Sequence, residues 1–271
     1  MRFRAHIALV LGLGTWETGA AQVVPEPTRA APPPVLGARD AGIAAAFALG
    51  ALAVAPFDRS IAVASQRASL QQGVVLRRTA TAFRRLAEPG SYVLLGAAYT
   101  AGRLGGSDRL AEAGLRGLEA EAIALVVTGG IKLAAGRARP YLGKGHPHDF
   151  ALGRGLRGSP WMSFPSGHTT AGFAAAAAVT STVTRWTPDA RWPVGVALYG
   201  AATLVGLSRI YDDRHWASDV VAGAAVGTVT GVAVARYHRT RPTTRLDRWL
   251  LGVSAQTRGA PWRLGPFVTV R

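Results

Sequence analysis

Residues 165–184 read PSGHTTAGFAAAAAVTSTVT, and the part from Thr169 to Thr184 contains no charged residue. Alanine has the highest intrinsic helix propensity, so this run predicts a helix. Other largely apolar segments of helical character lie between glycine and proline breaks. They are Ala41–Phe57, Ser91–Gly102, Leu115–Ala138, Trp192–Ser208 and Val220–Ala235. The sequence therefore predicts an all-α fold, a helical bundle of about six core helices.

The segments between these helices are more polar. Arg59–Arg85 is rich in arginine with spaced apolar positions, which predicts an amphipathic helix at a surface. Pro140–Phe164 is rich in glycine and proline and predicts a loop. Near the C-terminus, Trp249–Ala255 and Trp262–Val270 are β-like runs, so a short β-like tail is expected.

The first residues have the pattern of an export signal. Two arginines stand within Met1–Arg4, an apolar run covers Ile7–Trp16, and small residues follow at Gly19, Ala20 and Ala21. This order predicts a secretory signal peptide over 1–21, with a retained N-terminal anchor as the alternative. The expected organisation continues with a proline-rich linker over 22–37, one helical domain over 38–240 and a tail over 241–271.

Composition narrows the classes of partner and site. The chain has no cysteine, which excludes disulfide frameworks, cysteine zinc sites and cysteine nucleophiles. It has 31 basic and 15 acidic residues, a formal net charge of +16. Such a balance suits a partner that carries phosphate, whether nucleic acid, anionic lipid or a phosphoester. The export signal argues against nucleic acid.

The apolar segments are at the short end of the length that crosses ~30 Å of hydrocarbon. They fit either a bundle embedded in the inner membrane or a water-soluble periplasmic protein. If they span, the positive-inside rule places Arg185, Arg191 and the arginines after Ala235 in the cytoplasm. The loop over 140–164 then faces outward.

One consistent order of crossings starts outside after signal cleavage. Ala41–Phe57 enters the membrane from outside, so that Arg59–Arg85 lies inside, and Ser91–Gly102 does not cross. Leu115–Ala138 then returns to the outer side.

Three motifs point to phosphate chemistry. The first joins Lys132 and Arg139-Pro140, seven residues apart near one face of a helix that ends before the proline. A buried ammonium is costly without an anionic partner, so two cations at one helix end predict a dianion site. Snorkelling of both side chains to a surface is the alternative.

The second motif is Pro165-Ser166-Gly167-His168, at the start of the alanine-rich helix. Serine is a favoured helix cap, and the unpaired N–H groups of a first helical turn bind anions. Gly167 permits a close approach of the backbone to a ligand, and His168 adds a titratable proton there. An ordinary capped helix is the alternative.

The third motif is Ser208-Arg209, followed by His215 and Asp219. His215 and Asp219 are four residues apart, so they share a helix face, and a carboxylate there can orient the imidazole as a base or nucleophile. Arg209 can fork onto phosphate oxygens. A plain His–Asp helix pair is the alternative.

Taken together, the three motifs resemble the signatures of the type 2 phosphatidic acid phosphatase (PAP2) superfamily, which includes bacterial acid phosphatases and vanadium haloperoxidases. The resemblance covers roughly residues 40–240 and extends to Ser163-Phe164 and to Trp216-Ala217-Ser218 beside the motifs. It implies a helical bundle with the site between helix ends, and it implies no metal and no other cofactor.

The resemblance also implies a role for each motif residue. His215 would attack phosphorus and form a phosphohistidine, Asp219 would orient His215, and His168 would protonate the leaving group. The phosphoryl oxygens would be held by Lys132, Arg139, Ser166, Gly167 and Arg209.

The expected activity is therefore hydrolysis of phosphomonoester or diphosphate groups, with phosphorylated lipids as the leading substrates and small phosphoesters as the other class. Two alternatives remain: a vanadate-dependent haloperoxidase, in which His215 binds vanadate, and a non-catalytic basic envelope protein that binds anionic lipid. The oligomeric state does not follow from the sequence.

Overall fold

The computed structural model describes residues 33–241 and 244–252, and no strand occurs among them. The predicted signal peptide, most of the predicted linker and the run Trp262–Val270 lie outside these residues. The prediction of a β-like run over Trp249–Ala255 is wrong for its first three residues. Trp249–Leu251 form the end of helix α10 (Arg245–Leu251). Here a helix cap outweighs strand propensity, since the Thr244 hydroxyl accepts a hydrogen bond from the Asp247 amide at 3.1 Å.

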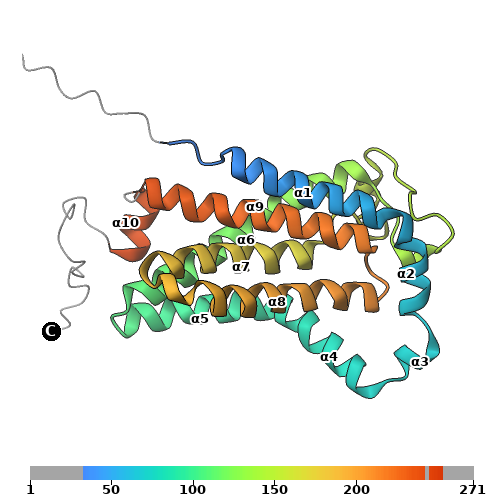
Figure 1. The fold of residues 1–271 in the computed structure, drawn as a ribbon, viewed down its shortest axis with the longest axis horizontal. Helices are drawn as coiled ribbons and strands as arrows, with labels where there is room; N and C mark the ends of the chain where they lie inside the picture. Colours follow the sequence, from blue (N-terminus) through green and yellow to red (C-terminus); the bar gives the residue numbers. More distant parts are fainter. Residues whose placement is uncertain (1–32, 242–243, 253–271) are drawn as a thin grey trace, which may run out of the picture. The chain divides into compact units, whose positions relative to one another are not determined.

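Six long helices form the bundle, as the sequence predicts. Helix α7 (Gly167–Trp186) packs against α6 (Asp108–Ala135), α8 (Arg191–Tyr211) and α9 (Ala217–Thr240). Helix α5 (Ser91–Leu104) lies against α6, and α1 (Ala38–Val54) lies against α9 (Figure 1). The alanine-rich helix is thus surrounded on three sides, which explains why its residues 169–184 carry no charge.

Small residues allow α7 and α9 to approach closely. Gly223, Gly227 and Gly231 follow one another at four-residue spacing on α9 and face α7. A Cβ atom built on Gly223 would stand 2.6 Å from the Ser166 carbonyl oxygen, and one on Gly227 would overlap the Thr170 carbonyl. Close backbone contact of this kind is typical of helix pairs in lipid.

The arginine-rich segment Arg59–Arg85 is not one helix. It is divided among α2 (Asp58–Ser65), α3 (Ala68–Gln71) and α4 (Val74–Arg85). The backbone turns extended at Arg67 and Gly73, just before α3 and α4 begin. Most of its side chains are exposed, as expected for a surface segment.

This segment lies at the same end of the bundle as the 140–164 loop. The Gln66 amide donates to the Tyr211 carbonyl at 2.9 Å, and Trp216 Nε1 donates to the Ala138 carbonyl at 2.8 Å. At the other end, Asp40 of α1 pairs with Arg236 of α9. The predicted order of crossings, with 59–85 and the loop on opposite sides of a membrane, is therefore wrong.

Helix α5 also belongs to the bundle. The Tyr99 hydroxyl donates to the Leu250 carbonyl at 2.9 Å, and Arg103 donates to the Leu251 carbonyl at 3.0 Å, so α5 ends beside α10. The order of crossings expected Ser91–Gly102 not to cross, whereas α5 packs along α6 as part of the bundle.

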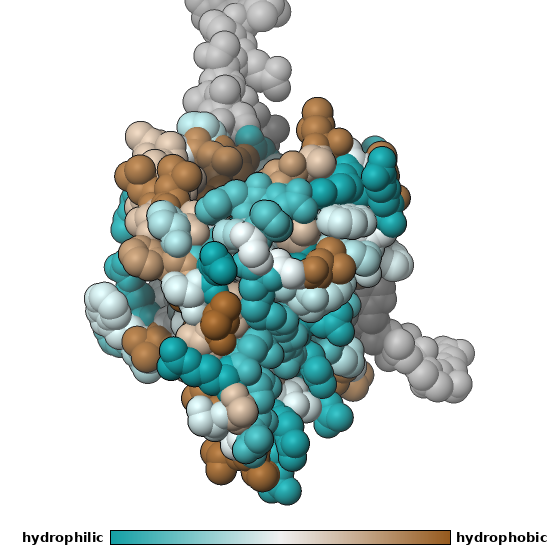
Figure 2. Space-filling view, turned by 90° about the vertical axis from the view of Figure 1, so that its right-hand side faces the viewer, coloured by the Kyte–Doolittle hydropathy of each residue, from teal (hydrophilic) through white to brown (hydrophobic). Residues whose placement is uncertain are grey.

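Large apolar side chains face outward along the bundle. Leu52 on α1 is 69% exposed, Val126 on α6 is 77% exposed and Val196 on α8 is 69% exposed. Three stretches are long and apolar enough to cross a membrane: Ala38–Ser65, Pro188–Tyr211 and Ala217–Thr240. By contrast, hydrophilic residues form a broad band across the end that carries α2 and α3 (Figure 2). An apolar girdle with a polar end suits a membrane-embedded bundle.

Candidate active site

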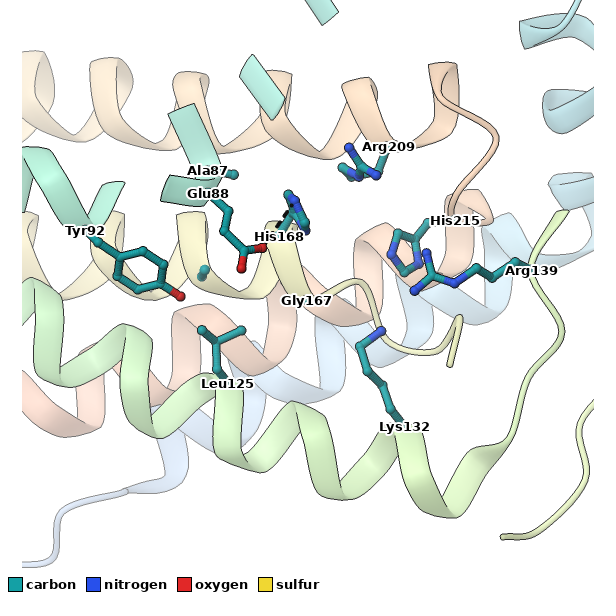
Figure 3. Close-up of a pocket in the computed structure, with 11 residues that line it drawn as sticks. Ala87, Glu88, Tyr92, Leu125, Lys132, Arg139, Gly167, His168, Arg209 and His215 are labelled. Atoms are coloured by element: carbon teal, nitrogen blue, oxygen red, sulfur yellow. Dashed lines mark ion pairs between the residues drawn. The ribbon is translucent and has the colours of Figure 1, made fainter. Parts of the chain in front are cut away.

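A cavity of about 210 Å³ opens where four segments meet: the last turn of α6, the first turn of α7, the last turn of α8 and the loop after α8. The helical turn η2 (Leu86–Gly90) closes one side. Six of the eight predicted site residues line this cavity (Figure 3), namely Lys132, Arg139, Gly167, His168, Arg209 and His215. The three motifs, far apart in sequence, therefore surround one space.

Three basic side chains line the cavity, and backbone carbonyls orient two of them. Lys132 Nζ donates to the Met162 carbonyl at 2.7 Å, and Arg139 Nε donates to the Ser159 carbonyl at 2.8 Å. A carbonyl fixes the direction of the side chain without cancelling its charge, so the cavity keeps positive potential for an oxyanion. The 140–164 loop supplies these carbonyls.

Arg209 is held differently. Its Nη1 atom pairs with Asp212 Oδ2 at 2.9 Å, and Arg84 of α4 lies 3.5 Å from the same carboxylate oxygen. The second loop carboxylate, Asp213, pairs with Lys144 at 2.7 Å. Asp212 therefore orients Arg209 in the cavity, whereas Asp213 pairs with a lysine that does not line it.

His215 stands in the loop between α8 and α9, in front of Asp219. Its Nδ1 atom lies 3.5 Å from Asp219 Oδ2, so the carboxylate faces one ring nitrogen as predicted. The shared helix face expected from the four-residue spacing is wrong, because α9 begins only at Ala217 and His215 precedes it. The His215 side chain is buried, and burial lowers its pKa to about 3, against the opposing effect of Asp219. The imidazole is therefore neutral at pH 7 and can act as a nucleophile.

Asp219 is fully buried and held by several donors. Its Oδ2 atom accepts from the Ser163 hydroxyl at 2.6 Å and from the Trp216 amide at 2.9 Å. Its Oδ1 atom accepts from Arg137 at 2.5 Å. Carboxylates with this many donors stay ionised and keep one orientation.

The serine of the second motif does not reach the cavity. Ser166 is the residue before α7 and is fully buried, but its hydroxyl makes no capping bond and instead accepts from the Thr169 hydroxyl at 2.9 Å. Its amide donates to the Asp219 carbonyl at 3.0 Å. The structure thus brings Gly167 and His168 to the cavity, while Ser166 joins α7 to α9.

Several residues around the site belong to none of the three sequence motifs. Glu88 lines the cavity with its Oε2 atom 3.5 Å from His168 Nε2, and its only signal was the Glu88-Pro89-Gly90 break before α5. Arg137 could have been noticed as a second arginine beside Arg139. Asp58 carried no signal, because it stands in an arginine-rich surface segment.

Among the residues that the structure describes, no group of three or more histidine, aspartate or glutamate side chains is placed to hold a metal ion. The cavity gathers the basic side chains of Lys132, Arg139 and Arg209 around one space. An arrangement of two imidazoles and three cations can bind a tetrahedral oxyanion and attack it.

Residues 114–243 match the model of the PAP2 superfamily. The lipid A 1-phosphatase of Porphyromonas gingivalis is 36% identical over 119 residues, which are 42% of this chain and 22% of that protein. The chain thus spans less than a quarter of the length of this relative. All three motifs lie inside the residues matched by the family model.

The fold is also that of a solved member of the superfamily. A crystal structure of the first transmembrane PAP2 type phosphatidylglycerolphosphate phosphatase from Bacillus subtilis superposes with a TM-score of 0.53 at 22% sequence identity. The match covers 76% of this chain and 98% of that one. Family model, relative and fold agree: residues 114–243 of this chain are similar to the PAP2 superfamily.

Proposed function

We propose that this protein is a phosphatase that removes phosphate from phosphorylated lipids through a phosphohistidine intermediate. The observation that carries the proposal is the single cavity in which His215, backed by Asp219, faces Lys132, Arg139 and Arg209. The lipid A 1-phosphatase and the phosphatidylglycerolphosphate phosphatase that the chain resembles act on lipid phosphates by their names.

In this mechanism the Nε2 atom of His215 attacks phosphorus while the bond to the leaving oxygen breaks. Asp219 faces Nδ1 and stabilises the positive charge that develops on the ring. The leaving oxygen takes a proton from His168 on the facing side of the cavity. Water then attacks the phosphohistidine, His168 accepts the proton of that water, and inorganic phosphate leaves.

The fixed cations take the part that metal ions play in many phosphoryl-transfer enzymes. Lys132, Arg139 and Arg209 hold the phosphoryl oxygens as charge builds in the transition state. We therefore expect phosphate release to continue in EDTA. We expect Gly167 to contribute its backbone, and Ser166 to act through the placement of α7 rather than through its hydroxyl.

An apolar groove supports a lipid as the substrate. A second cavity of about 170 Å³ lies between α5, α7 and α8 and is lined almost entirely by apolar side chains, among them Leu94, Val179 and Ala201. Ala87 lines both this groove and the phosphate cavity. An acyl or isoprenyl chain in the groove would bring its phosphate to His215.

The first experiment measures phosphate release from phosphatidate, an isoprenyl diphosphate, lipid A and p-nitrophenyl phosphate, in detergent with EDTA. We expect release by the wild-type protein and loss of at least 10³-fold in His215→Ala. Full activity in His215→Ala would reject the proposal. Bromination with vanadate and peroxide, without phosphate release, would favour the haloperoxidase alternative.

A second experiment tests the groove. Ala201→Phe fills it, and we expect KM for a long-chain phosphatidate to rise about 10-fold while hydrolysis of p-nitrophenyl phosphate is unchanged. Val196→Phe, on the opposite and exposed side of the same helix, is the matched control and should change neither. Equal effects of both variants would remove the support that the groove gives to a lipid substrate.

The side of the membrane that the site faces is a separate question. Arginines lie at both ends of the bundle, so the positive-inside rule favours neither orientation. Helix α1 begins at the end opposite the site, beside Arg236. An outward-facing site therefore requires residue 38 on the inner side, whereas a signal cleaved after residue 21 requires it on the outer side.

A further inference from the structure

A fully buried ion pair stands directly behind the site, and one of its members comes from outside the residues that match the family model. Arg137 Nη2 lies 2.7 Å from Asp58 Oδ2, and neither side chain is more than 2% exposed. Burying two charges is expensive, so such a pair persists only with further hydrogen bonds. Here every nitrogen of the guanidinium has a partner, including the Pro147 carbonyl.

The same guanidinium fixes Asp219. Arg137 Nη1 donates to Asp219 Oδ1 at 2.5 Å and to the Ser218 hydroxyl at 2.8 Å. With Oδ1 engaged, the other oxygen of Asp219 is the one that faces His215. The guanidinium lies over the Phe150 and Trp216 rings, at 4.8 and 5.5 Å from their centroids, so apolar walls surround the charges.

Asp58 holds the start of the helix that carries Asp219. Its Oδ1 atom accepts from the Ser218 amide at 2.9 Å, and its Oδ2 atom accepts from the Ser218 hydroxyl at 2.5 Å. Ser218 is in the first turn of α9, where a free N–H and the helix dipole favour an anion. A residue of α2 thus caps α9 from a distance in sequence.

Charge gives Asp58 a second effect. Arg137 alone would cancel the charge of Asp219 and weaken its effect on the imidazole. With Asp58 present, the three buried side chains sum to one negative charge behind His215. Asp219 therefore keeps its ability to stabilise a positive imidazole ring.

We infer that Asp58 and Arg137 are positioning residues for the reaction: they fix the orientation and the net charge of Asp219, and through it the direction in which His215 faces the phosphoryl group. The inference rests on the proposed function. It adds a residue of α2 to a site that the three motifs describe without it.

Asp58→Asn tests this inference with four readouts. We expect kcat to fall about 10- to 100-fold, the range seen when outer partners of an active-site ligand are lost, with KM within about 2-fold. Inhibition by phosphate should be unchanged, because the phosphate-binding cations are untouched. Inhibition by vanadate, which bonds to an oriented imidazole, should weaken at least 10-fold.

Asp40→Asn is the matched control. Asp40 is also a buried aspartate in the first part of the chain, and it lies 3.0 Å from Arg236 Nη2 of α9 at the far end of the bundle. We expect its kcat and its vanadate inhibition to match the wild-type protein, even where its thermal stability falls as much as that of Asp58→Asn. The comparison separates positioning from loss of an ion pair.

Ser218→Ala is a second variant that keeps all three charges. It removes the hydroxyl that links Asp58 and Arg137, so vanadate inhibition should weaken in the same direction but less. Unchanged vanadate inhibition in folded Asp58→Asn and in Ser218→Ala overturns the inference. If only Ser218→Ala folds, its result decides. Loss of activity in His215→Ala alone, with Asp58→Asn fully active, would leave the phosphatase proposal standing and reject this one.

Discussion

At the scale of single residues, the site depends on a histidine whose charge is suppressed. Burial lowers the pKa of His215, and the nearby Lys132 and Arg139 lower it further. Asp219 offsets only part of this effect. The sequence could predict the pairing of His215 with Asp219 from their spacing. It could not predict the lowered pKa, because that follows from burial by segments far away in the chain.

This burial predicts how stability depends on pH. The pKa of His215 is about 3 when folded and about 6.5 when unfolded, so below pH 6.5 the unfolded chain binds a proton that the folded protein does not. Acidification from pH 7 to 5 therefore lowers the free energy of unfolding, at a slope of up to about 1.4 kcal/mol per pH unit from this group. We expect the melting temperature of the wild-type protein in detergent to fall more than that of His215→Gln; parallel curves would contradict this assignment.

His168 gives a prediction about leaving groups. If it protonates the leaving oxygen, His168→Gln should slow hydrolysis of an alkyl phosphate by about 10²- to 10⁴-fold. p-Nitrophenyl phosphate needs little protonation, so its hydrolysis should slow much less. The ratio of kcat/KM for the two substrates measures this, and equal losses would mean that His168 does not act as the general acid.

At the scale of elements, close packing of α7 on α9 holds the second and third motifs together. Ser166 and Asp219, at the starts of these two helices, are joined by a backbone hydrogen bond of 3.0 Å. The uncharged runs predicted both helices. Their alanine and glycine residues permit the close contact between them. The breaks at Arg67 and Gly73 were not predicted, because an arginine-rich amphipathic pattern fits one helix as well as three short ones.

Gly227 is predicted to be a position where a methyl group is not tolerated. Gly227→Ala would overlap the Thr170 carbonyl and should destabilise the protein by about 1–3 kcal/mol. Gly200 of α8 has no atom within 4 Å of a built Cβ, so Gly200→Ala should stabilise by about 0.5–1 kcal/mol through helix propensity. Melting temperatures of the two variants in one detergent check this, and a neutral Gly227→Ala would contradict the packing described here.

At the scale of the whole molecule, the sequence predicted the helical bundle and the meeting of the three motifs, but not the path of the chain. The crossing order was wrong because it relied on the sign of loop charges, and the arginines of 59–85 lie at the site end. The role of Asp58 was not predicted either, because its neighbours in sequence are surface residues. Its partners Arg137 and Ser218 are some 80 and 160 positions away in the chain.

Orientation in the membrane can be measured directly because the chain has no cysteine. Gly145→Cys places a thiol in the exposed loop at the site end, and Asp189→Cys places one in the exposed turn between α7 and α8. An outward-facing site predicts that a membrane-impermeant maleimide labels only Gly145→Cys in intact spheroplasts. Labelling of Asp189→Cys alone would mean that the site faces inward, and labelling of both would mean that the bundle does not span.

The central claim is that one buried imidazole carries the phosphoryl group between substrate and water. Rapid quenching of the protein with ³²P-labelled phosphatidate, in EDTA, should trap a phosphoenzyme that is labile to acid and stable to base, as a phosphohistidine is. We expect this species in the wild-type protein and in Asp40→Asn, and its absence in His215→Ala. Phosphate release without any trapped phosphoenzyme, or equal labelling of His215→Ala, would contradict it.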